Sequence, residues 1–218
     1  MNILLIGCGK MGSALLQHWI SGGENFTIVD PALETKPDNV AFVKSRQALD
    51  DRKFDVIIAA VKPQQIDVIL PDYADAFTEE GYLLSIAAGC SIKRLKQAIG
   101  GRAVVRVMPN LPAAIAAGVS GMCASEDVST DQWNHAQDLM TRAGATILVE
   151  SEDKLDRVTA IAGSGPGYVF EFARAYVEAA MALGFSAEDA REMVLGTIEG
   201  SIGMARKTGQ PLEELRNS

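Results

Sequence analysis

Short runs of apolar, mostly β-branched residues alternate with helical patterns over the first 150 residues of the chain. A short apolar run bounded by turn residues is typical of a strand that is covered on both faces. Helical patterns lie between these runs, for example over Ser91–Ile99 and Thr130–Arg142. The alternation predicts an α/β domain with a doubly wound parallel sheet. The strand candidates are Ile3–Ile6, Phe26–Val29, Val40–Val43, Val56–Val61, Tyr82–Ile86, Val104–Val107 and Thr146–Val149.

The pattern changes after Glu150, where no further strand is indicated and helix follows helix. Ser151, Ser164 and Ser186 each precede a helical stretch, and such residues commonly cap helix N-termini. We therefore predict a dinucleotide-binding domain over residues 1–150 and an all-α domain over residues 151–218.

The helix expected over Tyr168–Leu183 is apolar around most of its circumference. Its charged residues, Glu171, Arg174 and Glu178, share one narrow stripe, so the helix is expected to be buried on several sides. The 68 residues of the helical part are too few to cover it alone. In the next helix, Gly196, Gly200 and Gly203 share one face, which favours close helix contact. These features predict a homodimer or higher oligomer.

Composition narrows the class of protein. The net charge is −8 and the basic residues form no run, which argues against a nucleic-acid partner. The 3 cysteines are scattered and only 2 histidines are present, so we expect neither a disulfide framework nor a metal site. The apolar runs are too short to span a bilayer, and the N-terminus lacks the basic region of a signal peptide. We expect a cytoplasmic protein.

The strongest motif is the glycine loop that runs from Gly7 to Gly12 between the first strand and the first helix. Gly7 permits a tight turn, Gly9 lets the backbone approach a pyrophosphate, and Gly12 allows close helix–strand packing. The helix N-terminus supplies N–H groups and positive dipole for the phosphates. The loop predicts a nicotinamide dinucleotide site made by Gly7, Cys8, Gly9, Lys10, Met11 and Gly12.

Asp30 ends the second predicted strand, where a carboxylate accepts hydrogen bonds from the ribose hydroxyls of NAD and repels the 2′-phosphate of NADP. No arginine follows it, so NADH is the favoured cofactor, with Lys36 the candidate for reversing this preference. A solvated carboxylate at a strand end is the alternative.

Three further groups follow predicted strands, at the sheet edge where ligands bind. Lys62 could contact the cofactor or be a surface lysine, and Ala87 and Ala88 could admit a ribose or pack in the core. Asn110 could orient the substrate or nicotinamide, or could form a turn. His18 and His135 are not expected to be catalytic, and the absence of a His- or Lys-based acid suits reduction of an already protonated imine.

The segments Gly7–Gly12, Ala60–Gln64, Val107–Pro112 and Ala162–Phe170 together resemble pyrroline-5-carboxylate reductase, in the right order over essentially the whole chain. That family reduces 1-pyrroline-5-carboxylate to L-proline with NAD(P)H, the last step of proline biosynthesis. The resemblance implies a Rossmann domain followed by a helical domain that interlocks with a second subunit.

By position, the resemblance assigns Ile6–Met11 to the pyrophosphate loop, Asp30 to the adenosine ribose, and Asn110 to the neighbourhood of the nicotinamide. It makes Gly163, Ser164 and Gly165 part of the mouth of the substrate site. The remaining residues that it assigns to the cofactor cleft are Ala60, Val61, Lys62, Pro63, Ile86, Ala87 and Ala88. Many members carry a small or amide residue in place of Asp30 and favour NADPH. The family's substrate loop, VTSPGGTT, is expected just beyond Ser218, so no catalytic residue is assigned here.

Two other functions stay open at this point. One is another small imine or β-hydroxyacid dehydrogenase, although such a β-hydroxyacid enzyme relies on a lysine in the first helix of the helical domain. Lys154 is the only lysine there, and it lies in the first turn. The other is a non-catalytic NAD-binding regulatory protein.

Overall fold

The computed structural model describes residues 1–35, 37–38 and 40–218. It divides into two compact units, Met1–Ser164 and Gly165–Ser218, which are described separately below. The domain boundary expected near residue 150 stays a prediction.

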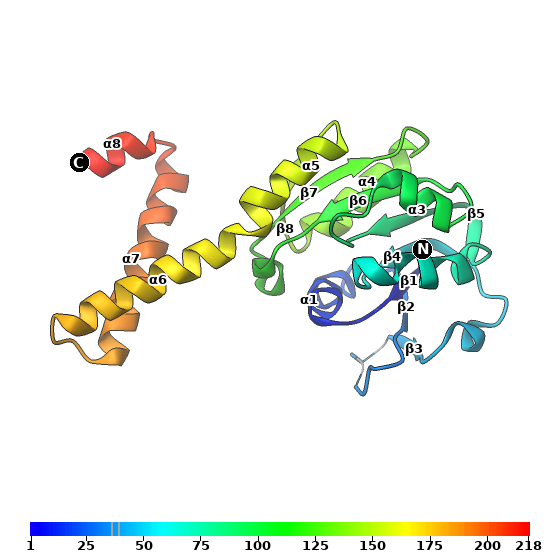
Figure 1. Cartoon of the computed structure of the whole chain (residues 1–218), viewed down its shortest axis with the longest axis horizontal. Coiled ribbons are helices and arrows are strands. Elements are labelled where there is room, and N and C mark those ends of the chain that lie inside the picture. Colours follow the sequence, from blue (N-terminus) through cyan, green and yellow to red (C-terminus); the bar gives the residue numbers. More distant parts are fainter. Residues whose placement is uncertain (36, 39) are drawn as a thin grey trace. The chain divides into compact units, whose positions relative to one another are not determined.

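The N-terminal unit is built on one sheet, whose strands within the described residues have the order β3-β2-β1-β4-β5-β6-β7-β8 (Figure 1). All neighbouring strands are parallel except β6 and β7, which are antiparallel. The strands are β1 (Asn2–Ile6), β2 (Asn25–Val29), β3 (Ala41–Val43), β4 (Phe54–Ala59), β5 (Phe77–Ser85), β6 (Val104–Met108), β7 (Gly118–Ala124) and β8 (Gly144–Leu148). The helices are α1 (Lys10–Trp19), α2 (Ile66–Ile69), α3 (Ile92–Ala98), α4 (Thr130–Thr141), α5 (Glu152–Val158) and the π-helix η5 (Thr159–Gly163).

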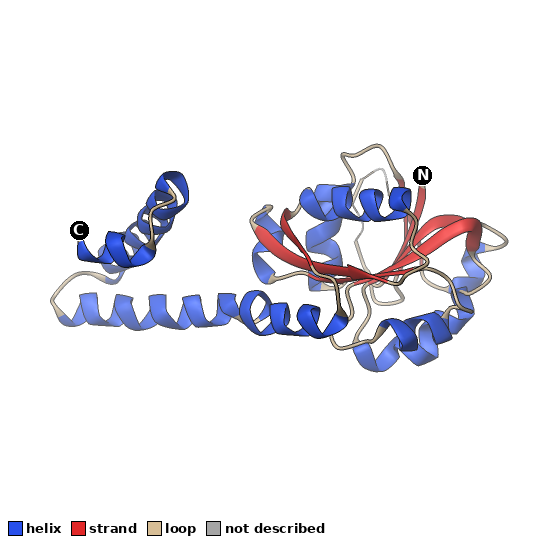
Figure 2. Ribbon diagram, turned by 90° about the horizontal axis from the view of Figure 1, so that it is seen from above, coloured by secondary structure: helices blue, strands red, loops and turns tan. Residues whose placement is uncertain are grey.

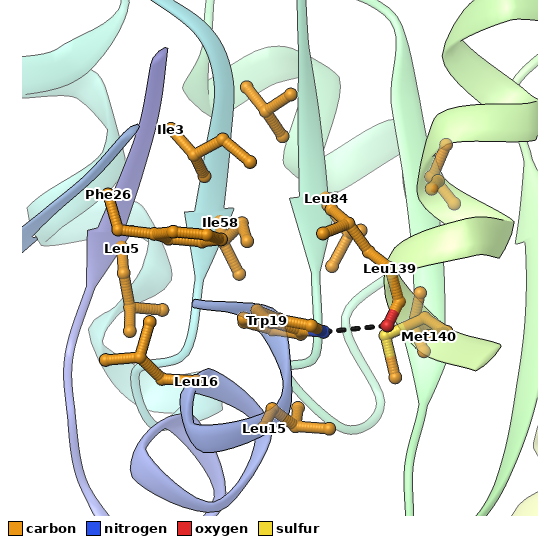
Figure 3. Packing of buried hydrophobic residues seen from close by; sticks show 14 of the residues in the cluster. Ile3, Leu5, Leu15, Leu16, Trp19, Phe26, Ile58, Leu84, Leu139 and Met140 are labelled. Carbon is orange, nitrogen blue, oxygen red and sulfur yellow. Dashed lines mark hydrogen bonds between the residues drawn. The ribbon is translucent and has the colours of Figure 1, made fainter. Parts of the chain in front are cut away.

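Helices cover both faces of this sheet, as the turned view shows (Figure 2). Alternate residues of each strand point to opposite faces of the sheet, so their side chains contribute to two separate apolar cores. One core packs against α1 and α4, and the other against α2 and α3. Trp19 of α1 is fully buried in the first core, where it stacks on Phe26 and donates a hydrogen bond to the Leu139 carbonyl, 2.9 Å away (Figure 3).

The predicted fold class, an N-terminal Rossmann domain with a doubly wound sheet followed by a helical region, is confirmed. Strand β7 was not predicted, because its sequence, GVSGMCA, consists mainly of small residues without a β-branched run. Gly121 needs to be small: a Cβ atom there would lie 2.7 Å from Leu155 Cδ1 of α5. Five strands begin earlier than predicted: β5 at Phe77, β4 at Phe54 and β8 at Gly144 by two residues or more, and β1 at Asn2 and β2 at Asn25 by one.

The C-terminal unit contains α6 (Gly165–Ala182), α7 (Ala187–Thr208) and α8 (Leu212–Asn217). Ser186 caps α7 by accepting a hydrogen bond from the Asp189 N–H at 3.1 Å, as its spacing predicted. In the predicted charged stripe of α6, Arg174 pairs with both Glu171 and Glu178. None of the helices in the described part of the chain is both long and apolar enough to cross a membrane.

Candidate active site

The glycine loop joins β1 to α1 at the carboxyl edge of the sheet, and each glycine has a distinct reason to be glycine. Gly7 has φ +86°, which L side chains rarely adopt, and its N–H donates to the Val29 carbonyl at 2.9 Å. At Gly12, a Cβ atom would lie 2.8 Å from the Gly7 carbonyl oxygen. At Gly9, a Cβ atom would meet nothing within 4 Å, so the space above this residue is open to a ligand. This arrangement fits the close approach of a pyrophosphate.

Asp30 is joined to the glycine loop by its own carboxylate. Its Oδ2 accepts a hydrogen bond from the Cys8 N–H at 2.7 Å, and its Oδ1 accepts one from the Ala32 N–H at 2.8 Å. Each carboxylate oxygen has a second lone pair, so ribose hydroxyls can still bind. Burial, together with the charge of Asp30, raises the pKa of the Cys8 thiol, which is therefore not activated as a nucleophile.

A cleft of about 570 Å³ opens beside this loop. It brings together many of the predicted cofactor residues, from the ends of β1, β2 and β4: Ile6, Gly7, Gly9, Asp30, Ala60, Val61 and Lys62. The other predicted residues do not line it: Cys8, Lys10, Met11, Gly12, Pro63, Ile86, Ala87 and Ala88. Ile86 follows the next strand, β5, and its N–H donates to the Ala59 carbonyl at 3.0 Å.

The cleft also contains basic residues that were not among the predicted cofactor residues. Lys44 and Arg46 follow β3. This strand pairs with β2, the strand that Asp30 follows. Arg46 is used internally, since its guanidinium pairs with Asp75 and donates to the Asp72 carbonyl at 2.9 Å. Lys44 is exposed at the cleft. The sequence signal for these basic residues was Lys44-Ser45-Arg46, directly after a predicted strand. Lys36, the residue predicted to offset the charge of Asp30, lies outside the described residues.

Arg94 of α3 holds the loop that follows β4. Arg94 donates to the Pro63 carbonyl at 2.9 Å while its guanidinium also pairs with Asp67 at 2.8 Å. Lys62 itself is exposed, and its N–H donates to Gln65 Oε1 at 3.3 Å. The backbone of the loop is thus fixed while the Lys62 side chain faces the cleft.

Asn110 lies just beyond β6 and is only 7% exposed. Its Oδ1 accepts from the Val119 N–H at 2.8 Å, and its Nδ2 donates to the Ala162 carbonyl at 3.0 Å. Both functions of the amide are therefore used within the protein. Gly163 and Ser164 come directly after Ala162 in the chain. The hydrogen bond to Ala162 therefore brings these two predicted substrate-side residues close to Asn110.

Neither histidine lines the cleft. His18 Nε2 lies 3.4 Å from the Ala114 carbonyl, and His135 Nδ1 lies 2.9 Å from the Tyr82 hydroxyl. Across the ranges that the structure describes, no three His, Cys, Asp or Glu side chains gather as potential metal ligands. The expectation that no metal is needed stays a prediction.

Comparison with known proteins agrees with this geometry. A family model described as pyrroline-5-carboxylate reductase dimerisation matches residues 152–218, and one described as NADP oxidoreductase coenzyme F420-dependent matches residues 2–89. Pyrroline-5-carboxylate reductases from Methanosarcina acetivorans and Pseudomonas aeruginosa are 32% and 34% identical over 99% of this chain, covering 83% and 82% of the relatives. This chain belongs to the pyrroline-5-carboxylate reductase family.

Solved structures of the same family have the same fold. The pyrroline-5-carboxylate reductase of Coxiella burnetii is 32% identical and matches with a TM-score of 0.89 over 99% of this chain and 83% of its own. The Plasmodium falciparum pyrroline carboxylate reductase, solved with NADP bound, is 28% identical, with a TM-score of 0.88 over 100% of this chain and 83% of its own.

Proposed function

We propose that this chain catalyses the NAD(P)H-dependent reduction of 1-pyrroline-5-carboxylate to L-proline, the last step of proline biosynthesis. The observation that carries the proposal is the similarity to pyrroline-5-carboxylate reductases over 99% of the chain. The cleft beside an open Gly9 supports a dinucleotide in the same place.

The residues of the N-terminal unit have separable tasks in this function. The N–H groups at the start of α1 bind the pyrophosphate, while Asp30 binds the adenosine ribose and holds the loop through Cys8. The nicotinamide, when bound, supplies a hydride. The two histidines are placed away from the cleft, which suits a cyclic imine that arrives already protonated. Gly163, Ser164 and Gly165 are proposed to line the mouth of the substrate site.

NADH is the favoured cofactor in this proposal. The Asp30 carboxylate repels a 2′-phosphate, and its hydrogen bonds to two backbone N–H groups hold it in place. The exposed Lys44 on the cleft is the described residue best placed to offset that repulsion.

The proposed enzyme is a homodimer or larger oligomer assembled through its helical region. The match of residues 152–218 to a dimerisation family model supports this assembly. A cytoplasmic location and the lack of a nucleic-acid partner stay predictions.

The deciding experiment follows NADH oxidation with 1-pyrroline-5-carboxylate, using the protein made from its full open reading frame. We expect cofactor-dependent formation of L-proline. The dehydrogenase alternative is tested in the opposite direction, by following NAD⁺ reduction with a β-hydroxyacid as the hydride donor. Such an enzyme relies on a lysine, but Lys154 is paired with Glu150. Tight NADH binding without turnover of any cyclic imine would instead support the regulatory alternative and reject the proposed reaction.

A further inference from the structure

Three side chains from β6 and the residues just after it contact the neighbouring segment that α5 and η5 form. Arg106, Met108 and Asn110 lie at alternate positions of an extended backbone, so their side chains leave the same face of the sheet. In order along the chain, they contact the beginning of α5, then the end of the π-helix η5. The contacts are Arg106 with Glu152 and Asp156, Met108 with Gly163, and Asn110 with Ala162.

The contact at Arg106 is ionic, and its arginine is buried while its carboxylate partners are partly exposed. This arginine is 6% exposed, and its guanidinium pairs with Glu152 and, at 3.1 Å, with Asp156. Glu152 Oε1 also accepts from the Ile92 N–H at 2.8 Å, which adds the start of α3 to the same cluster. An uncompensated buried charge is strongly unfavourable, so this cluster specifies where α5 lies on the sheet.

The contact at Asn110 is an amide bridge whose orientation is set by its partners. The Val119 N–H can only donate and the Ala162 carbonyl can only accept, so Oδ1 faces the former and Nδ2 the latter. Asn110 thereby joins the start of β7 to the last turn of η5. Met108 packs close to Gly163 at the end of the same turn, because a Cβ atom on Gly163 would lie 3.1 Å from Met108 Cε.

The segment held in this way has an unusual backbone. Its turn is closed by a hydrogen bond from the Ser164 N–H to the Thr159 carbonyl at 3.1 Å, the wider spacing of a π-helix. Such turns are rare and mostly occur as single turns, frequently at functional sites. Gly163 and Ser164, which we assign to the substrate side, form the end of this turn.

We propose that Asn110, supported by Arg106, is a positioning residue that fixes the π-turn and thereby sets where Gly163 and Ser164 meet the substrate. The amide has no unused function to offer a substrate while it bridges Val119 and Ala162. Its role is to hold a backbone rather than to touch the reacting atoms. The part of this inference that concerns substrate rests on the proposed function; the part that concerns the turn does not.

The test is Asn110→Asp in the full-length protein. One carboxylate oxygen still accepts from the Val119 N–H, but the other now faces the Ala162 carbonyl oxygen and repels it. We expect hydrogen exchange at the Ser164 amide to accelerate by about tenfold or more, because the turn opens locally. We also expect kcat/KM for 1-pyrroline-5-carboxylate to fall about tenfold, with the Kd for NADH within about twofold of the unmodified protein.

The matched control is Ser125→Ala, which removes a comparable side-chain bond at the opposite end of β6. Ser125 Oγ accepts from the Val104 N–H at 2.9 Å. This variant should leave both Ser164 exchange and kcat/KM unchanged. If Asn110→Asp does not fold, Arg106→Lys replaces it as the test variant. A lysine keeps the positive charge but lacks the planar guanidinium that binds two carboxylates at once. Exchange at the Ser164 amide should again accelerate, and kcat/KM should again fall.

Loss of activity with unchanged Ser164 exchange would mean that Asn110 touches the substrate or cofactor directly, and would overturn the proposal. Unchanged exchange with unchanged activity would overturn it as well. Absence of turnover in the unmodified protein would reject the proposed reaction alone, because the exchange measurement reports on the turn without any substrate.

Discussion

At the glycine loop, the effect of a methyl group depends on what it would meet. Gly9 has φ −71° and ψ −167°, which alanine adopts, and open space beyond its Cα. Gly9→Ala should therefore change the free energy of unfolding by less than about 0.5 kcal/mol, while raising the Kd for NADH by about tenfold or more. Isothermal titration and urea unfolding of the same preparation measure both quantities.

Gly12→Ala is the matched comparison, since the added atom is the same and the surroundings differ. Its Cβ would lie 2.8 Å from the Gly7 carbonyl oxygen. We expect a loss of stability of about 1–3 kcal/mol, reduced by the better helix propensity of alanine. If Gly9→Ala retained full NADH affinity, the pyrophosphate would not approach the loop where we place it.

Asp30 holds the glycine loop and is proposed to bind the adenosine ribose, and a substitution should affect both roles. Asp30→Ser removes the acceptor of the Cys8 N–H and the negative charge, together with the proposed ribose contact. A hydrogen bond to a charged group contributes about 1.5–3 kcal/mol, so the Kd for NADH should rise at least about tenfold. NADPH should be less affected, because the repulsion of its 2′-phosphate is removed, and the preference should narrow or reverse.

Fluorescence titration with both cofactors measures this prediction, and Asp51→Ser, which removes an exposed carboxylate outside the cleft, is its control. The control should change neither affinity. If the unmodified protein bound NADPH as tightly as NADH, the preference would be wrong, and Lys44→Ala would then show whether that side chain supplies the compensating charge.

Ion pairs connect the ends of helices and strands in the N-terminal unit. One of the more buried pairs joins Glu24 to Arg142. Glu24 precedes β2, its side chain is 9% exposed, and it accepts from Arg142 at the end of α4, at 2.7 and 2.9 Å. Arg142 also donates to the Trp19 carbonyl at 3.2 Å, which includes α1 in the cluster. The hydrogen bonds from Arg142 hold the pKa of Glu24 below its ordinary value of 4.5.

Because the pKa is lowered in the folded state, ionised Glu24 stabilises the fold above the unfolded-state pKa, and this contribution is lost as the pH falls through the folded-state pKa. Glu24→Gln should lower the free energy of unfolding by about 2 kcal/mol near pH 7. The difference from the unmodified protein should shrink as the pH falls below 4.5. Urea unfolding over a pH series measures it.

Glu150→Gln provides the control, because Glu150 pairs with Lys154 on the surface, where it is 67% exposed. An exposed pair of this kind is screened by water and contributes little, so this variant should be nearly neutral at every pH. A constant destabilisation by Glu24→Gln down to acid pH would show that shape, rather than charge, explains the role of Glu24.

Hydrophobic periodicity predicted those elements that are long or bounded by clear turn residues. The strands β1, β2, β4 and β6 and their order of appearance followed from β-branched runs, and Ser151 and Ser186 marked real helix starts. The missed strand β7 owes its place to contacts with β6, β8 and α5 rather than to its own propensity.

The candidate site divides in the same way. The glycine loop and Asp30 were predicted, because a local motif specifies them. The internal use of both functions of Asn110 could not be predicted, because its partners Val119 and Ala162 lie 9 and 52 residues away along the chain. The π-turn of η5 had no sequence signal, since long-range contacts hold it.

At the scale of the molecule, the helical unit exposes many large apolar side chains, and contiguous exposed apolar patches mark interaction surfaces. A groove of about 490 Å³ between α6 and α7 is lined almost entirely by apolar groups, including Phe172, Tyr176 and Ile202. The large apolar side chains that are exposed in this unit are Tyr168, Val169, Phe170, Phe172, Tyr176, Met181, Leu183, Phe185, Met193, Leu195, Ile202, Met204 and Leu212. Burial against a second copy would remove this surface from water, which agrees with the dimerisation family that residues 152–218 match.

The glycine face of α7 gives the sharpest test of that assembly. Cβ atoms at Gly196, Gly200 and Gly203 would meet nothing within 4 Å in their own chain. Three glycines inside a helix cost about 1 kcal/mol each relative to alanine, a cost that only a close neighbour would offset. The buried residues of α7, Ala190 and Val194, lie on a different side of the helix. The neighbour is therefore expected to be the second subunit.

Gly200→Leu should then weaken assembly without weakening the helix itself. Overpacking costs about 1–3 kcal/mol at each copy, so the dimer dissociation constant should rise by at least about tenfold. Sedimentation velocity at micromolar concentrations measures it, and circular dichroism should show that the helix content is retained. Asn134→Leu, at an exposed position of α4, adds the same side chain elsewhere and should leave the dimer intact. A stable, well-folded monomer of the unmodified protein would refute the assembly, and an unchanged dimer in Gly200→Leu would place the interface on the α6 surface instead.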